Sequence, residues 1–295
     1  MAPPEAGNHR VQCVADVQAV LGEGPVWVES EQALYWVDIK GRKIFRLRTP
    51  GGLDEWPTPF RIGCIAPKRS GGLIAGTDGG LATIDLGSGR FELFANPEKG
   101  RPGNRFNDGK VDRQGRLWAG TMDDEERQAS GALYRIGPDL DCTLIDDGYR
   151  VTNGPAFDPS GSRMYVTDSA LQTIHVFDLS GDGEASGKRV FAQFGEGDGY
   201  PDGMTVDAEG NLWVAFWDGW CLRKISPAGK ILEKVGMPVQ RPTSCTFGGP
   251  HLDRLYVTSA RRGIDAEAPD MQPCAGGLFL VEAGARGLAD VPFAG

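Results

Sequence analysis

Histidine is scarce in this chain of 295 residues, and its cysteines follow no metal-binding pattern. The three histidines are far apart in sequence: His9, His175 and His251. A Ser-His-Asp triad or a zinc site with histidine ligands is therefore difficult to assemble. The six cysteines form no C-x-x-C pair, which favours free thiols in a reducing compartment over disulfides or zinc.

Several other signatures are also missing. The chain has no G-x-S-x-G nucleophile motif and no phosphate-binding G-x-x-x-x-G-K-[ST] loop. No apolar run approaches the ~20 residues of a membrane span. The start has neither the basic nor the apolar region of a secretory signal, so we expect a cytoplasmic protein. Net charge is −9 without a Lys/Arg stripe, which argues against a nucleic-acid partner.

Glycine and proline, in contrast, are abundant. The 43 glycines and 20 prolines indicate many short strands joined by turns. A short apolar run recurs six times, and the first residues of successive runs are 39 to 48 positions apart: 34–38 (LYWVD), 73–77 (LIAGT), 117–121 (LWAGT), 164–168 (MYVTD), 212–215 (LWVA) and 255–259 (LYVTS). This period is typical of the four-stranded blades of a propeller.

Further runs complete each unit. A third strand is expected at 43–47, 80–84, 132–136, 173–177, 221–225 and 277–281, and fourth strands at 91–94 and 189–191. We predict an all-β fold, a six-bladed β-propeller with four-stranded antiparallel blades around a central channel. It forms one domain over 1–295, with 1–9 as a flexible tail. Residues 10–14 would supply the outer strand of the last blade and leave no open edge. A β-sandwich would not explain the sixfold period.

The repeat also aligns a set of polar residues. Glu23, Asp108, Asn153, Asp202 and Ser244 each precede the recurring run by 9 to 11 residues. Because the first strand of every blade lines the channel, these positions form a ring at one end of it. Asp-Gly and Asn-Gly pairs also cap turns, which is the alternative explanation for any one position. Turn capping does not explain Glu23, because glutamate is a poor turn residue.

A ring of carboxylates needs a cation or protons to offset its repulsion. Oxygen donors favour Ca²⁺, Mg²⁺ or Mn²⁺, with Zn²⁺ or Fe²⁺ less favoured without histidine. Nearby, Arg105 and Asn107 can hydrogen-bond the oxygens of a polyol or an acid. The polar run 122–127 (MDDEER) is placed to cover the channel mouth, although a solvated charge run is the simpler interpretation.

Six short motifs resemble the senescence marker protein (regucalcin), gluconolactonase and sugar-lactonase family, and the likeness spans about 13–281. They are 22–27 (GEGPVW), 35–39 (YWVDI), 105–112 (RFNDGKVD), 120–122 (GTM), 152–155 (TNGP) and 200–203 (YPDG). The resemblance implies one catalytic divalent metal with ligands Glu23, Asn153 and Asp202. It further implies substrate contacts from Arg105, Asn107 and Glu125. Asp108 matches a position near the metal whose role varies in the family.

These features predict a metal-dependent hydrolase that opens an aldonolactone of the glucono-, xylono- or arabinono-lactone type, with Asp202 as the catalytic base. The expected partner is a small sugar lactone, with no membrane, and the protein is expected to be a monomer or small homo-oligomer. Two alternatives stay open: a calcium-binding regulatory protein of the regucalcin type, and a metal-dependent organophosphate or ester hydrolase. A scaffold protein has no reason to gather carboxylates around the channel.

Overall fold

The computed structural model describes residues 9–48, 50–264 and 272–295. Most of the expected N-terminal tail, residues 1–8, lies outside the described residues. His9, the last residue of that expected tail, hydrogen-bonds through Nδ1 to the carbonyl oxygen of Glu282 at 2.9 Å. None of the described helices is long and apolar enough to cross a membrane.

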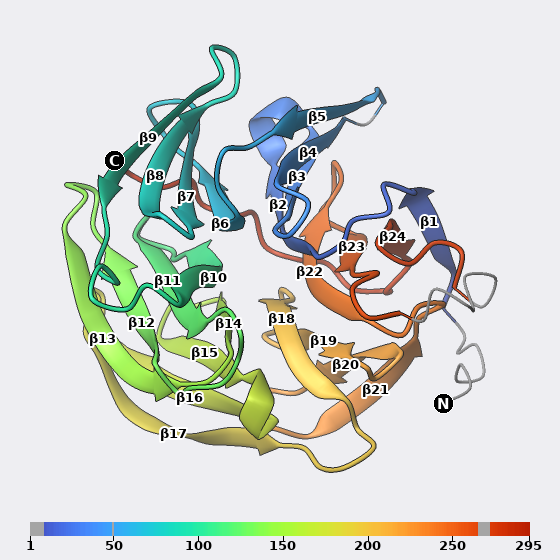
Figure 1. Cartoon of the computed structure of the whole chain (residues 1–295). Coiled ribbons are helices and arrows are strands. Elements are labelled where there is room, and N and C mark those ends of the chain that lie inside the picture. Colours follow the sequence, from blue (N-terminus) through green and yellow to red (C-terminus); the bar gives the residue numbers. More distant parts are fainter. Residues whose placement is uncertain (1–8, 49, 265–271) are drawn as a thin grey trace.

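The described strands form six antiparallel sheets of four strands each, arranged in a ring (Figure 1). The first blade consists of β2 (Gly22–Val28), β3 (Ala33–Asp38), β4 (Lys43–Arg48) and β5 (Leu53–Pro57). The second consists of β6 (Ile62–Pro67), β7 (Leu73–Thr77), β8 (Gly80–Asp85) and β9 (Arg90–Ala95). The third consists of β10 (Asn104–Val111), β11 (Leu117–Asp123), β12 (Gly131–Ile136) and β13 (Cys142–Tyr149). The fourth blade consists of β14 (Thr152–Phe157), β15 (Arg163–Asp168), β16 (Thr173–Leu179) and β17 (Ala185–Gln193). The fifth consists of β18 (Tyr200–Val206), β19 (Leu212–Trp217), β20 (Cys221–Ile225) and β21 (Ile231–Gly236). The predicted six-bladed propeller is confirmed.

The last blade combines both ends of the chain. It consists of β22 (Pro242–Gly248), β23 (Arg254–Ser259), β24 (Leu278–Val281) and, at its outer edge, β1 (Val11–Ala15). In the register of this pair, Val11 lies opposite Val281 and Cys13 lies opposite Phe279. The prediction that the N-terminal strand closes the ring is confirmed. Two short 3₁₀ turns, Glu29–Glu31 and Ser169–Leu171, follow β2 and β15.

Burial decreases from the channel outward. The second strands β3, β7 and β11 are buried at every position, whereas the outer strand β5 alternates between exposed and half-buried residues. Neighbouring blades cover both faces of the inner strands, which explains their continuous apolar runs. Trp36, Trp118 and Trp213, one from each of three second strands, are among the largest fully buried side chains.

A buried aspartate ties the first turn of a blade to the tryptophan of its second strand. In the fifth blade, the Asp207 carboxylate accepts hydrogen bonds from the backbone N–H of Glu209 at 3.0 Å and of Asn211 at 2.9 Å. It also accepts the indole N–H of Trp213 at 3.0 Å. In the third blade, Asp112 accepts the indole N–H of Trp118 at 2.8 Å. The turn chemistry and the apolar run of this repeat are therefore linked through one carboxylate.

Every innermost strand has a register shift near the same end of the channel. The shifts fall between Glu23 and Val26 in β2, and at the corresponding places in the other five innermost strands. A β-bulge bends a strand and re-aims its side chains, and bulges are common beside active sites. Five of the six shifts include or adjoin the predicted ring positions, and the shift in β6 contains Gly63.

The C-terminal segment after β24 crosses the opposite end of the channel. The backbone N–H of Gly287 donates to the Leu252 carbonyl at 2.7 Å, and that of Phe293 donates to the Pro67 carbonyl at 2.8 Å. These two contacts lie on blades six and two, so the segment spans the ring (Figure 1). Phe293 is fully buried there. The channel is therefore covered at the end away from the bulges.

We expect Asp207→Ala to lower the free energy of unfolding by about 3 kcal/mol, because it leaves a buried indole N–H and two turn amides without acceptors. Urea unfolding followed by tryptophan fluorescence measures this loss. Asp85→Ala removes an exposed turn aspartate that accepts N–H bonds from Gly87 and Ser88, and should change stability little. Equal effects of the two substitutions would contradict the structural role assigned to Asp207.

Candidate functional site

An open cavity of about 570 Å³ lies at the bulged end of the channel. Five of the six predicted site residues line it together: Glu23, Arg105, Asn107, Asn153 and Asp202. The sixth, Glu125, is exposed and does not line this cavity, whereas its neighbour Glu126 does. The volume lies within the range of small-molecule sites.

Four of these residues come from four different blades. Glu23 lies in β2, Asn107 in β10, Asn153 in β14 and Asp202 in β18, each next to the register shift of its strand. Their exposed fractions are 5%, 6%, 2% and 6%, so all four are buried. The cavity floor is therefore made of side chains held on the rigid inner strands.

The carboxylates of the floor destabilise one another. Burial, followed by repulsion from Asp108, raises the pKa of Glu23 to about 8. Burial and repulsion from Glu23 and Asp108 raise the pKa of Asp202 well above its usual range. Among the described residues, neither Glu23 nor Asp202 forms an ion pair that would offset this cost. The only hydrogen bond that the Glu23 carboxylate accepts from a described residue comes from the Gly24 N–H, at 3.1 Å.

Asp108 differs from the other two carboxylates. Its two oxygens accept the backbone N–H groups of Gly109 at 2.8 Å and Gly154 at 3.0 Å. Burial raises its pKa, but these hydrogen bonds limit the rise to about 6. Its carboxylate is therefore already satisfied by the protein backbone, unlike those of Glu23 and Asp202.

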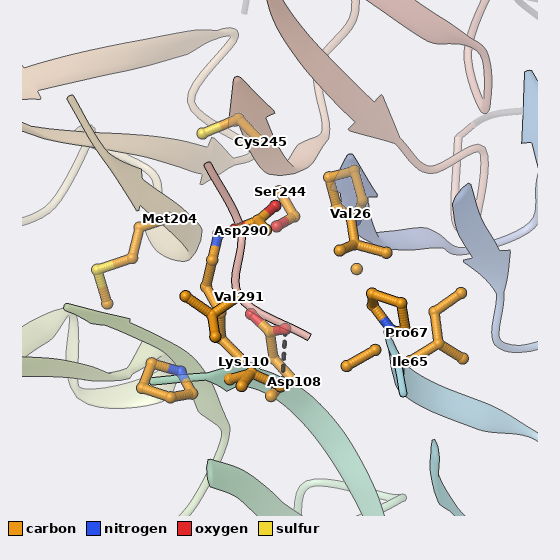
Figure 2. Close-up of a pocket in the computed structure, with 16 residues that line it drawn as sticks. Val26, Ile65, Pro67, Asp108, Lys110, Met204, Ser244, Cys245, Asp290 and Val291 are labelled. Atoms are coloured by element: carbon orange, nitrogen blue, oxygen red, sulfur yellow. Dashed lines mark hydrogen bonds and ion pairs between the residues drawn. The ribbon is translucent and has the colours of Figure 1, made fainter. Parts of the chain in front are cut away.

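A second, smaller cavity contacts Asp108 inside the channel. It has a volume of about 30 Å³, room for one or two water molecules, and Figure 2 shows Asp108, Lys110, Ser244 and Asp290 around it. Lys110 Nζ lies 3.4 Å from Asp290 Oδ1. Asp290 belongs to the C-terminal segment that covers this end of the channel. Asp108 thus lines the inner cavity, and Glu23 and Asp202 line the open one.

A chain of hydrogen bonds orients the carboxamides of the floor. Arg105 Nη1 donates to Asn107 Oδ1 at 2.6 Å, and Asn107 Nδ2 donates to Asn153 Oδ1 at 3.0 Å. Asn153 Nδ2 then donates to Ser169 Oγ at 2.9 Å, and the Ser169 hydroxyl donates to the Pro201 carbonyl at 2.6 Å. With its nitrogen bound to Ser169 and its oxygen bound by Asn107, the Asn153 carboxamide is held in one orientation in the cavity lining.

Asp124 anchors the start of this chain. Its Oδ1 accepts Arg105 Nε at 2.5 Å and Lys40 Nζ at 2.7 Å, and its Oδ2 pairs with Arg61. Hydrogen bonds and charge from Lys40 and Arg105 outweigh burial and hold the pKa of Asp124 well below its usual range. No sequence motif singles out this residue beyond its place in the run 122–127, because its three cationic partners come from other parts of the chain.

The donor set fits a hard divalent cation. Two carboxylates that pair with no described cation and one oriented carboxamide oxygen line the cavity floor, and oxygen ligands are those preferred by Ca²⁺, Mg²⁺ and Mn²⁺. The described part of the chain has no group of three or more His, Cys, Asp or Glu side chains placed to hold a metal ion. Glu23, Asn153 and Asp202 could hold one as a mixed carboxylate and carboxamide set.

The fold and the cavity define a six-bladed propeller with a buried, oxygen-rich site at one end of its channel. The family described as SMP-30/Gluconolactonase/LRE-like region matches residues 21–261, and the chain belongs to this family. The predicted resemblance is confirmed.

Relatives match over nearly their whole length. The chain is 38% identical to the L-arabinolactonase of Azospirillum brasilense, over 96% of this chain and 95% of that protein. It is 34% identical to regucalcin of Xenopus laevis, over 97% and 99% of the two chains. The crystal structure of regucalcin from Agrobacterium tumefaciens, described as a calcium-binding protein, superposes with a TM-score of 0.92 at 26% identity, over 96% and 97% of the two chains.

Stability of the chelated protein should fall as the pH rises. The carboxyl pKa of Glu23 is raised from 4.5 to about 8, so the folded chain binds more protons than the unfolded chain between these values. The stabilisation is therefore present at acidic pH and lost as pH approaches 8. We expect the unfolding midpoint in EDTA to be several degrees lower at about pH 8.5 than at about pH 5.5.

Glu23→Gln is the control for this pH dependence. The substitution removes the titrating carboxyl, so the difference between the two midpoints should shrink. Scanning calorimetry at both pH values measures it. A chelated protein that is equally stable at both pH values, or an unchanged difference in Glu23→Gln, would contradict the electrostatic account.

Proposed function

We propose that this protein is a metal-dependent sugar lactonase that hydrolyses an aldonolactone to the aldonic acid. The observation that carries the proposal is the cavity floor, where two carboxylates that pair with no cation of the described chain lie with an oriented carboxamide beside the polar groups of Arg105 and Asn107. The similarity to an L-arabinolactonase over 96% of the chain supports a lactone substrate. The particular sugar, among glucono-, xylono- and arabinono-lactones, follows from the shape of the loops around the mouth.

Glu23, Asn153 and Asp202 are the residues that would hold the metal, which is one of Ca²⁺, Mg²⁺, Mn²⁺, Zn²⁺ or Fe²⁺. When bound, a divalent cation supplies Lewis-acid polarisation of the lactone carbonyl. The protein contributes the rigid placement of these ligands on three inner strands. Asn107 contributes through its hydrogen bond to Asn153 Oδ1, which restricts rotation of that carboxamide.

Asp202 acts as the general base of the reaction. Its carboxylate faces the cavity and accepts the proton of the attacking water as the bond to the lactone carbonyl carbon forms. The proton is then available to the ring oxygen, which leaves as the hydroxyl of the sugar acid. Burial raises the pKa of Asp202 and so disfavours its charged form. A divalent cation held beside it would favour the deprotonated form that a general base needs.

Arg105 and Asn107 are the proposed substrate contacts. Arg105 is buried, and Asp124 and Asn107 hold its guanidinium in one orientation at the cavity wall. A preoriented guanidinium binds ring hydroxyls with little loss of side-chain freedom. The acidic contact predicted at Glu125 stays a prediction. Glu126 is the acidic residue of that loop with a side chain on the cavity, so it is the alternative for this role.

Removal of the metal should abolish activity. After dialysis against EDTA, we expect acid release from gluconolactone, xylonolactone and arabinolactone, followed with a pH indicator, to fall to the uncatalysed rate. Adding back single divalent ions identifies the active metal. Full turnover by the chelated protein would exclude a metal-dependent mechanism.

Asp202→Asn should lose activity by at least ~10²-fold, the contribution typical of a general base. Because the substitution removes a buried carboxylate with a raised pKa, the variant should fold as well as the wild type. Lactone hydrolysis and the unfolding midpoint are measured together. Asp178→Asn, at an exposed position of β16, is the matched control and should keep full activity. Wild-type rates in Asp202→Asn would refute its role.

A calcium-binding regulatory protein without turnover is the second candidate. The structural match to a regucalcin described as calcium-binding supports it, and the same ligands can hold Ca²⁺. Calorimetric Ca²⁺ binding combined with no acid release from any lactone of the panel would favour this candidate. Acid release that depends on the metal would favour the lactonase.

A further inference from the structure

We propose that the mouth of the cavity is an anion subsite centred on Arg150, and that the substrate is a lactone carrying a second, anionic group away from its carbonyl. The proposal rests on the proposed function, because it names the class of lactone. The anionic group is a phosphate, a sulfonate or a carboxylate, since a guanidinium binds all three.

The cavity concentrates arginine on a protein that is acidic as a whole. Net charge is −9, yet four arginines line this one cavity: Arg105, Arg150, Arg241 and Arg262. Its acidic lining residues are Glu23 and Asp202 at the floor and Glu126 at the mouth. Two of the three carboxylates thus lie at the floor, where the lactone carbonyl would react, and the third lies with arginines nearer the mouth.

Three of the four arginines already have acidic partners. Arg105 pairs with Asp124 at 2.5 Å. Arg241 Nε donates to Asp218 at 2.7 Å, and its guanidinium lies 4.6 Å from the centre of the Trp217 ring. Arg262 lies 3.9 Å from Glu126. Each of these three guanidinium groups therefore has a carboxylate nearby, although the Arg262–Glu126 pair is exposed and weak.

Arg150 differs in having no such partner among the described residues. Its guanidinium forms no hydrogen bond or ion pair with any of them, although its backbone is held firmly. The N–H groups of Arg150 and Val151 donate to the two oxygens of the buried Asp168 carboxylate at 3.0 and 3.2 Å. A fixed backbone thus presents to the cavity a guanidinium that no described residue binds, and the next residue, Val151, also lines the cavity.

This arrangement suits a ligand with two different ends. The lactone end would occupy the floor beside Asn153 and Asp202, and the anionic end would receive the paired N–H groups of Arg150. A neutral lactone would leave Arg150 to solvent and gain nothing from it. The subsite therefore discriminates by the charge of the substrate rather than by its ring.

The experiment compares matched lactones. We expect wild-type kcat/KM to be at least 10-fold higher for glucono-lactone bearing a 6-phosphate, a 6-sulfonate or a terminal carboxylate than for glucono-lactone itself. The preference should weaken in high salt, because the Arg150 side chain is exposed. Which of the three anions is preferred identifies the source of the charge.

Arg150→Gln should reduce the ratio of kcat/KM for the preferred anionic lactone to that for the neutral lactone by about 10-fold, mainly through KM. Arg150→Lys should restore only part of the ratio, since it keeps the charge but loses the guanidinium fork. Arg90→Gln, on the outer strand β9, is the control and should leave the ratio unchanged. A wild-type preference for the neutral lactone, or an unchanged ratio in Arg150→Gln, would overturn the subsite.

A binding measurement separates this proposal from the lactonase itself. If no lactone is hydrolysed, the proposed function fails, and the subsite is tested by calorimetry with 6-phosphogluconate and gluconate as ligands. Tighter binding of the phosphorylated acid that is lost in Arg150→Gln supports the subsite. Equal binding of both acids, or no binding of either, overturns it.

Discussion

The rest of the structure depends on one constraint, the burial of Glu23 and Asp202 at one end of a propeller channel with no cationic partner among the described residues. Each charge loses hydration, and each repels the other and Asp108. A chain can hold such groups together only if its framework is too rigid to separate them. Six blades packed side by side, closed by pairing of β1 with β24, provide that framework. A bound divalent cation would attract both carboxylates and so offset their mutual repulsion.

The same constraint explains the polar network around the floor. Asp124 forms ion pairs with Lys40, Arg61 and Arg105. Hydrogen bonds then link Arg105 to Asn107 and Asn107 to Asn153. Each member is buried or half-buried with its hydrogen bonds satisfied, which is the condition under which a buried polar network rigidifies a site. The bulges of the innermost strands complete the arrangement by aiming the ring positions at the channel.

Much of the fold could be predicted because repetition is visible in a single sequence. The six apolar runs predicted the second strands, and residues 10–14 predicted the closing strand, as the pairing of Val11 with Val281 confirms. The arrangement of the cavity was harder to predict from the sequence. Residue spacing placed Asp108 in the same ring as Glu23 and Asp202, but two backbone N–H groups bind its carboxylate and it faces the inner cavity. The family resemblance implied Glu125 as the acidic contact of the loop, whereas Glu126 lines the cavity, since one residue along a loop changes which side chain faces it.

The sequence by itself determined the architecture and the chemical type of the site, because strand period, turn residues and oxygen-donor side chains are local properties. Only the tertiary structure decided which polar residues meet. Asp124 and its partners Lys40, Arg61 and Arg105 lie up to 84 positions apart, and the C-terminal Asp290 meets Lys110 across the channel. These contacts depend on how whole blades pack against one another. No local pattern encodes that packing, so the charge balance of the cavity, including the Arg150 guanidinium that no described residue binds, became visible only in the folded chain.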